Sequence, residues 1–127
     1  MADYTAKRID DMQANHGGGF VLARAELGVT AFGMQVIQMP PGFDGYPDHD
    51  HADSGQEEVF AVLSGSGAME IEGERVEMDN GTLIRVGPET RRKVIAGPQG
   101  IRMLVVGCAP GEAYKIAEGT ELEAIEG

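Results

Sequence analysis

Two histidines separated by one residue are the part of this sequence best suited to chemistry. His49 and His51 alternate with Asp48 and Asp50, so in an extended segment the imidazoles project from one face and the aspartates from the other. Imidazoles whose Cβ atoms are roughly 7 Å apart can both reach one first-row metal ion. A carboxylate from a neighbouring strand would complete a face of two nitrogens and one oxygen with open coordination positions. A solvated histidine pair in an acidic loop is the alternative interpretation.

The candidates for that third ligand follow a few residues downstream. Gln56, Glu57 and Glu58 begin a run that reads as a strand and ends near Gly65. Gln56 and Glu58 have the same parity in this strand, so either side chain could face the histidines, whereas Glu57 is expected to point away.

The surrounding residues resemble the cupin superfamily. The first motif of that family combines a glycine, a His-x-His pair, a glutamate and a second glycine at characteristic spacings, and the matching residues here are Gly42, His49, His51, Glu58 and Gly65. The resemblance extends over about residues 30 to 110 and includes a run typical of the family, Glu-Val-Phe-x-Val-Leu-x-Gly. It implies an all-β fold, a double-stranded β-helix or jelly-roll barrel, with a pocket inside.

The resemblance also implies a mononuclear divalent metal site (Fe, Mn, Ni or Zn) on His49, His51 and Glu58. Six residues separate His51 from Glu58, more than is usual, and counting forward from His51 places Gln56 at the glutamate position. We prefer Glu58 because its spacing to Gly65 matches the family and because a carboxylate is the stronger ligand for a divalent ion. Gln56 remains its substitute.

A second motif departs from the family, because Arg92 occupies the position of the last metal-binding histidine. A guanidinium stays protonated and cannot ligate a metal. Either three residues hold the metal without a fourth, or Arg92 replaces the metal by pairing with Glu58 and offers a positive charge to an anion. We expect Arg92, Phe60 and Tyr46 to line the substrate side of the pocket.

These residues predict a protein that binds a small polar or anionic metabolite. If the protein is metal-dependent, it would hold the metabolite at the metal ion. If it is also an enzyme, the resemblance implies an oxygenase, isomerase or decarboxylase. The alternative is a metal-free binding or sensing module built on Glu58 and Arg92. Similarity to small cupins also implies a homodimer, for which the strand expected at 30–39 could supply an edge.

Short strands separated by glycine-rich turns must position these side chains. The pattern predicts eight or nine strands over residues 20–27, 30–39, 57–63, 68–72, 75–78, 82–86, 93–96 and 101–106, with a hairpin turn at Gly65-Ser66-Gly67. The whole chain, 1–127, is expected to be one domain. Its barrel would cover about 20–110, while residues 1–19, with at most one helical turn, and the acidic tail 112–127 would be peripheral.

The amino-acid composition excludes some classes of binding partner. The 127 residues carry 21 acidic and 10 basic side chains, a formal net charge of −11, so the surface would repel nucleic acid and anionic lipid. The single cysteine, Cys108, excludes an internal disulfide and suggests inert packing. No apolar leader or bilayer-length segment is present, which predicts a cytoplasmic protein. His16, in an Asn-His-Gly loop, is expected to be a solvated residue.

Overall fold

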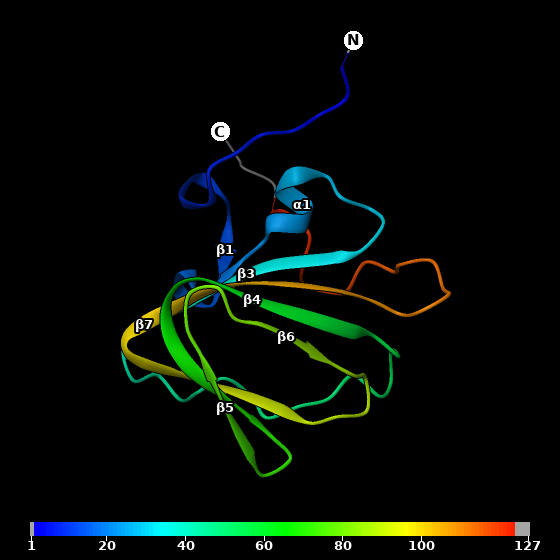
Figure 1. The fold of residues 1–127 in the computed structure, drawn as a ribbon. Helices are drawn as coiled ribbons and strands as arrows, with labels where there is room; N and C mark the ends of the chain where they lie inside the picture. The colour runs from blue at the N-terminus through cyan, green and yellow to red at the C-terminus, as the bar shows by residue number, and fades with distance from the viewer. Residues whose placement is uncertain (1, 124–127) are drawn as a thin grey trace.

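The computed structural model describes residues 2–123 and is built almost entirely from antiparallel strands (Figure 1). Four residues of the predicted tail, 124–127, lie outside the described residues. The elements in chain order are η1 (Ile9–Asp11), β1 (Ala14–Asn15), η2 (His16–Gly18), β2 (Phe20–Val21), α1 (Ala23–Leu27), β3 (Gly33–Met39), β4 (Glu57–Ile71), β5 (Glu74–Met78), β6 (Leu83–Val86) and β7 (Arg92–Cys108).

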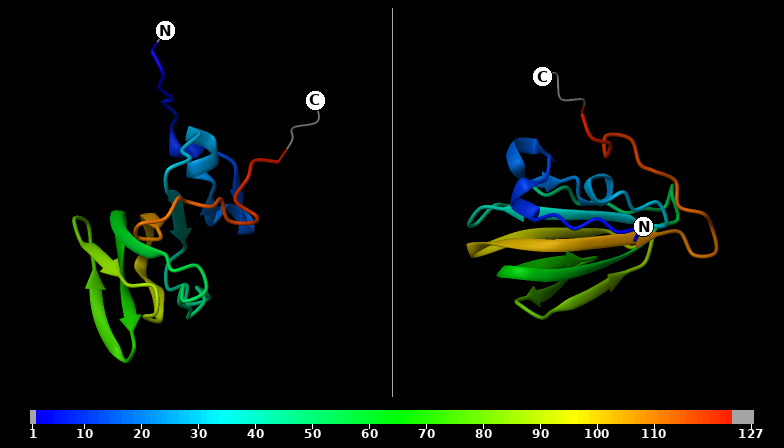
Figure 2. Two further views of the ribbon diagram at one scale, coloured as in Figure 1. Left: turned by 90° about the vertical axis from the view of Figure 1, so that its right-hand side faces the viewer. Right: turned by 90° about the horizontal axis from the view of Figure 1, so that it is seen from above.

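The strands follow one another in the order β1-β2-β3-β7-β4-β5, and β6 pairs with β4. Two long strands dominate this arrangement: β4 and β7 pair from Glu57 opposite Cys108 to Ile71 opposite Arg92. In Figure 1 both ribbons fold back on themselves, and the right-hand view of Figure 2 shows β3, β7 and β4 in succession. The predicted all-β jelly-roll barrel is thereby confirmed.

The interior of the barrel is filled by side chains of alternating strand residues. Phe60, Met69 and Met103 are completely buried there, together with Val94 and Met78. On β4 the buried residues Phe60 and Val62 alternate with the exposed Val59 and Leu63, which is the period of two that the sequence pattern predicts. The methionines Met39, Met69 and Met103 belong to this core.

The predicted hairpin turn at Gly65-Ser66-Gly67 is wrong, because these residues lie inside β4. The ladder with β7 shifts register between Val62 and Ser64 and again between Gly65 and Gly67. A Cβ on Gly65 would lie 2.1 Å from the carbonyl oxygen of Gly100, so glycine is needed for the two bent backbones to meet. What the sequence suggests as several short strands is therefore two long, bent ones.

The strand predicted over residues 20–27 is also wrong beyond its first two residues. Ala23–Leu27 forms helix α1, and Gly28 closes it in the left-handed conformation with its N–H donating to the carbonyls of Arg24 and Ala25. Alanine, arginine, glutamate and leucine all favour a helix. The apolar residues Val21 and Ala23 pack on Val36 of β3. Because these two buried residues are two positions apart, the segment has the hydrophobic pattern of a strand.

Strand β3 is not a free edge. It pairs with β7 along its whole length and with β2 through Phe20 opposite Ile37 and Val21 opposite Val36. An exchange of strands through residues 30–39 would therefore have to displace β2. Within residues 2–123, no helix is long and apolar enough to cross a membrane.

Segments from both ends of the chain lie together on one side of the barrel. η1 is the helical turn predicted near the N-terminus, η2 is a second turn that was not predicted, and residues 112–123 contain no helix. The Asn15 side-chain amide donates to the carbonyl of Gly119, and the side-chain amide of Gln13 exchanges hydrogen bonds with the backbone of Glu123. Figure 2 shows these end segments beside α1 and away from β5.

Candidate functional site

A cavity of about 1110 Å³ opens between the barrel and the segments from the two chain ends. Its walls come from residues 16–20, from β3, from the segment that carries Tyr46, His49 and His51, and from the residues Tyr114, Ala117 and Thr120. Gln56 and Glu58 of β4 also line it. The His-x-His pair and both candidates for its third ligand thus face one cavity.

Backbone hydrogen bonds to the start of β7 hold the His-x-His segment in place. His49 and Arg92 exchange N–H···O=C bonds of 3.0 and 2.8 Å, and the N–H of His51 donates to the carbonyl of Pro88 at 2.7 Å. Residues directly opposite each other in such a pair project from the same face. The position of Arg92 therefore lies on the same side as His49, as the second motif predicted.

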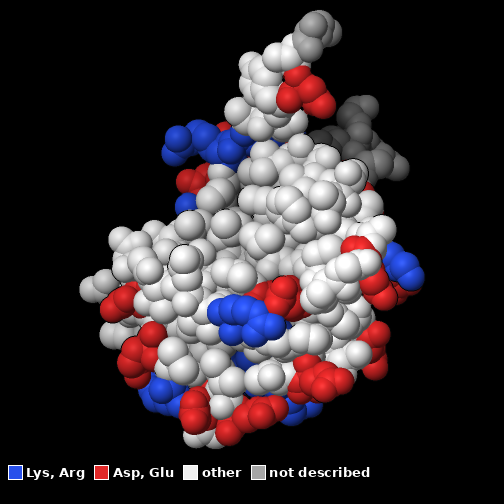
Figure 3. All heavy atoms as spheres, turned by 45° about the vertical axis from the view of Figure 1, so that its right-hand side comes forward, with Lys and Arg blue, Asp and Glu red and all other residues white. Residues whose placement is uncertain are grey.

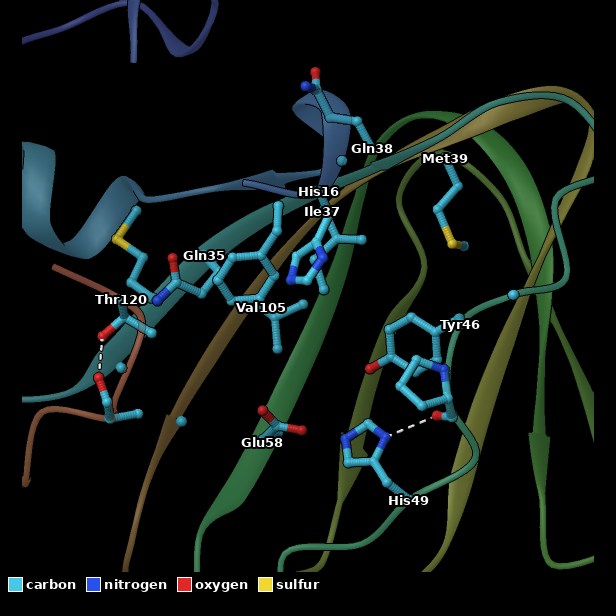
Figure 4. A pocket seen from close by; sticks show the side chains of 18 of the residues that line it. His16, Gln35, Ile37, Gln38, Met39, Tyr46, His49, Glu58, Val105 and Thr120 are labelled. Atoms are coloured by element: carbon cyan, nitrogen blue, oxygen red, sulfur yellow. Dashed lines mark hydrogen bonds between the residues drawn. The ribbon is translucent and has the colours of Figure 1, made fainter. Parts of the chain in front are cut away.

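The nitrogen and oxygen atoms of His49, His51 and Glu58 converge. One ligand atom from each of these residues lies within 4.8 Å of the other two, and the two imidazoles meet edge to face with their centroids 4.9 Å apart. Figure 4 shows Glu58 and His49 pointing into the cavity from different elements. Two imidazoles and one carboxylate are a donor set that Zn, Fe, Mn or Ni accepts.

The orientation of His49 is fixed by a second hydrogen bond. Its Nδ1 lies 2.8 Å from the carbonyl oxygen of Pro47, and because a carbonyl only accepts, Nδ1 carries the proton. In the neutral imidazole, Nε2 is then the unprotonated nitrogen and can coordinate a metal, the arrangement by which proteins usually orient histidine ligands. This observation shows that the side chain fits a metal centre.

A single oxygen atom of Glu58 contacts two neighbouring side chains. Its Oε1 lies 3.1 Å from Nε2 of His51 and 2.9 Å from Nη1 of Arg92. The nitrogen of His51 either donates its proton to this carboxylate or coordinates a metal in place of that proton. The contacts with His51 and Arg92 both use Oε1, so they leave Oε2 for a metal contact.

Arg92 lies beneath the site and not in it. Its side chain is completely buried, and it donates to Glu58 and to the carbonyl of Gly87 at 2.7 Å. Its Nε is buried without a hydrogen-bond partner among residues 2–123. Arg92 faces inward and pairs with Glu58, one of the two predicted arrangements, but it is not among the residues that line the cavity.

Of the other two residues predicted for the substrate side, one lines the cavity and the other does not. Phe60 is completely buried in the barrel core and does not line the cavity. Tyr46 does line it, and its ring lies 5.5 Å from that of His49. Burial raises the pKa of the Tyr46 phenol well above its usual value, and the Glu58 carboxylate raises the pKa further. Tyr46 is therefore a neutral hydrogen-bond donor at neutral pH.

Several lining residues escaped the sequence analysis. His16 is exposed, as expected, but it forms part of the cavity wall together with the glycines that follow it. Gln35 and Gln38 of β3 and Thr120 near the C-terminus also contribute. The run Gly17-Gly18-Gly19 was the available signal for this wall, since glycines permit a backbone to approach another surface closely.

Comparison with known proteins agrees with this architecture. A family model described as "Cupin domain" matches residues 35–107, and no curated protein is similar enough in sequence to match the chain. A cupin protein from Bacteroides fragilis has 21% identity and a TM-score of 0.72, covering 98% of this chain and 100% of that chain.

Two other solved structures are similar over most of their length. A protein from Photorhabdus luminescens has 18% identity and a TM-score of 0.64, covering 87% of this chain and 90% of that chain. A structure from Silicibacter pomeroyi, described as a sugar phosphate isomerase from a cupin superfamily, has 16% identity and a TM-score of 0.68, with 81% of this chain and 74% of that chain covered. At these identities the likeness shows the fold.

Proposed function

The chain belongs to the cupin domain family, and on that premise we propose that it binds a small polar or anionic metabolite at a divalent metal ion in its cavity. His49, His51 and Glu58 would hold the ion. The observation that carries this proposal is the convergence of their ligand atoms within 4.8 Å on the wall of one cavity. The free Nε2 of His49 and the free oxygen of Glu58 support it.

A metal ion bound there would supply a Lewis acid or an oxygen-activating centre. The residues around it have separate tasks. Arg92 fixes the carboxylate of Glu58 from below, the phenol of Tyr46 donates a hydrogen bond to a ligand oxygen, and Gln56 offers an amide at the rim. An isomerase, oxygenase or decarboxylase reaction would fit such a site, and a sugar phosphate isomerase is one of the similar structures.

Metal content of the purified protein tests the proposal. After loading with Fe, Mn, Ni or Zn and gel filtration, we expect about one ion per chain by elemental analysis, and a loss of that ion in the double variant His49→Ala, His51→Ala. The matched control is Asp48→Ala, Asp50→Ala, which changes two charged residues of the same segment on its opposite face. Stoichiometric metal in the double histidine variant would contradict the site.

A second candidate is a metal-free binding or sensing module, and the buried Arg92–Glu58 pair favours it. In that form the pair takes the place of the metal, and His49 and His51 bind the ligand directly. Purified protein would then contain negligible metal. Arg92→Ala would lower the free energy of unfolding by roughly 3–5 kcal/mol, because it leaves the Glu58 carboxylate without its buried partner.

We also propose that the protein forms a homodimer. The outward faces of β4 and β6 expose apolar side chains side by side: Val59 is 39%, Leu63 41% and Leu83 71% exposed, and Leu83 is paired with Ala61 in register. Such a patch is more often found at interfaces than on monomers. The cytoplasmic location expected from the sequence stays a prediction.

A further inference from the structure

His16 has a backbone conformation that needs an explanation. Its φ is 54°, in the left-handed region, and it shares this property with only one other non-glycine residue among residues 2–123, Glu72. A non-glycine residue held in this region is strained, and residues in such conformations cluster at functional sites. Gly17 and Gly18 follow it, also with positive φ. Of these three consecutive residues with positive φ, only His16 carries a side chain.

The loop that carries His16 is anchored firmly to strand β3. The N–H of Gln38 donates to the carbonyl of Gly19 at 2.8 Å, and the side-chain amide of Gln38 donates to the carbonyl of Gly18 at 3.0 Å. A Cβ on Gly19 would lie only 3.2 Å from the carbonyl oxygen of Gln38. Gly19 thus lies closely against β3, and the loop that carries His16 is held there with it.

The imidazole of His16 is oriented but has no polar partner. It packs edge to face on Phe20, with ring centroids 6.1 Å apart and an angle of 85°. Unlike His49, which donates to Pro47, it makes no hydrogen bond within residues 2–123. Figure 4 shows His16 and His49 in the same cavity, carried by different elements. Both nitrogens of His16 are therefore available to a ligand.

Part of the cavity wall is apolar. Phe20, Ile37, Val105 and Met34 line the cavity together with the polar residues, and Ile37 is paired with Phe20, on which His16 packs. The volume of about 1110 Å³ lies at the upper end of sites that hold drug-sized ligands. A ligand that touched the histidine pair alone would leave this wall uncovered.

We propose that the ligand is an elongated molecule with two polar ends and an apolar middle. One oxygen-bearing or anionic end lies at His49 and His51, the apolar body lies along Phe20, Ile37 and Val105, and a second hydrogen-bonding group is bound by His16. The proposal rests on the proposed function, since it assigns the ligand class of that same cavity. It makes His16 a specificity-determining residue.

Two series of straight-chain acids test this ligand class by calorimetry on protein taken through the zinc-loading step, whether or not it retains the ion. Monocarboxylates of about four to ten carbons should bind more tightly by about fourfold for each methylene that reaches the apolar wall. Dicarboxylates of the same lengths should show an optimum at the length that brings the second carboxylate to His16. Equal affinity for all lengths in both series would overturn the proposal.

His16→Asn provides the sharper test, because asparagine tolerates the left-handed conformation and removes only the imidazole. We expect it to weaken the best dicarboxylate by about tenfold or more, while the monocarboxylate of equal length changes less than twofold. Glu72→Asn is the matched control, with the same backbone conformation at a turn outside the cavity, and should change neither. Equal losses for both acids, or none, would overturn the role of His16.

These experiments separate the inference from the proposed function. A protein that takes up no zinc but shows the length optimum and the His16→Asn loss contradicts the metal site and supports the ligand class. A protein that takes up zinc on His49 and His51 but binds every acid equally supports the metal site and overturns the ligand class.

Discussion

At the scale of single residues, Arg92 distinguishes this chain from the pattern of its family. A guanidinium occupies the position of a metal-binding histidine, completely buried, with its charge directed at the carboxylate that the metal would also use. The Glu58 carboxylate thereby contacts a permanent cation and the imidazole of His51. The affinity of the three-residue site for a metal should therefore depend on Arg92 although Arg92 cannot bind the metal.

Replacing Arg92 by histidine should restore a four-residue site. We expect Arg92→His to raise the affinity for Zn²⁺ by roughly tenfold or more, since a positive charge leaves and a nitrogen donor arrives on the same face as His49. Competition with a chromophoric chelator measures the change. Arg91→His, at the exposed neighbouring position, is the control and should leave the affinity unchanged. An unchanged or lower affinity in Arg92→His would contradict this account of the site.

At the scale of elements, the barrel depends on two strands that bend at glycines. Gly65 of β4 meets the backbone of Gly100 of β7, and Gly67 meets the carbonyl of Ile95, at distances that exclude a Cβ. These contacts let β4 pair with β5 at one end and with β6 at the other. The same strand thereby carries Glu58 to the cavity and Met69 to the core.

Gly65→Ala should destabilise the protein severely. The new Cβ would overlap the carbonyl oxygen of Gly100, and φ is +76°, so we expect a loss of at least about 3 kcal/mol in the free energy of unfolding. Chemical denaturation measures it. Gly73→Ala is the control: φ there is +89° but nothing lies within 4 Å of the Cβ, so it should cost about 1 kcal/mol. Equal costs would mean that crowding at Gly65 is unimportant.

Helix α1 should make the attachment of the N-terminal segment sensitive to acid. The backbone N–H of Gln13 and then the ammonium of Lys7 donate to Glu26 and lower the pKa of its carboxyl below the usual value. This carboxylate contributes stability above its unfolded pKa, and that contribution is lost as the pH falls through its folded pKa. Glu26→Gln should therefore flatten the fall in stability between about pH 5 and pH 3.

Thermal denaturation across that pH range provides the measurement. The exposed Glu74 on β5 offers a control variant, Glu74→Gln, which should follow the wild-type curve. If Glu26→Gln and the wild type lose stability in parallel, the contacts of Glu26 do not contribute to the acid response.

Much of the barrel and of the candidate metal site was predictable, because both follow from spacing along strands. The parity of His49 and His51 and the distance from Glu58 to Gly65 are enough to bring three side chains together. The bends were not predictable from local pattern, because Gly65-Ser66-Gly67 has the composition of a turn and only its partner strand shows it to be a bulge. The part of the cavity wall formed by His16 was not predictable for a similar reason. His16 lies in a loop without periodicity, and the position of this loop depends on contacts with Gln38.

At the scale of the whole molecule, the charged and the apolar surfaces are unevenly distributed. In Figure 3 acidic and basic side chains crowd the lower part of the visible face, while much of the upper part carries no charge. The outward side chains Val59, Leu63 and Leu83 lie on β4 and β6, together with the exposed pair Arg85–Glu57. A second copy of the chain could cover this apolar surface while the surrounding acidic side chains remain in water.

Leu83→Lys tests this interface. We expect the wild-type protein to sediment as a dimer, and we expect the substitution to shift it toward monomer, because a charge would be buried against a second copy. Analytical ultracentrifugation at several concentrations gives the dissociation constant. Ile116→Lys, at an exposed apolar residue near the C-terminus, is the control. A wild-type monomer, or a dimer that tolerates Leu83→Lys, would contradict the proposed interface.

The walls of the cavity come from the first 20 residues, from the barrel and from the segment around Thr120. During synthesis on a ribosome, residues 16–20 would emerge before the histidine pair and Glu58, and the segment around Thr120 would emerge after them. The cavity would therefore be completed only once residue 120 has left the exit tunnel, although its candidate metal ligands emerge much earlier.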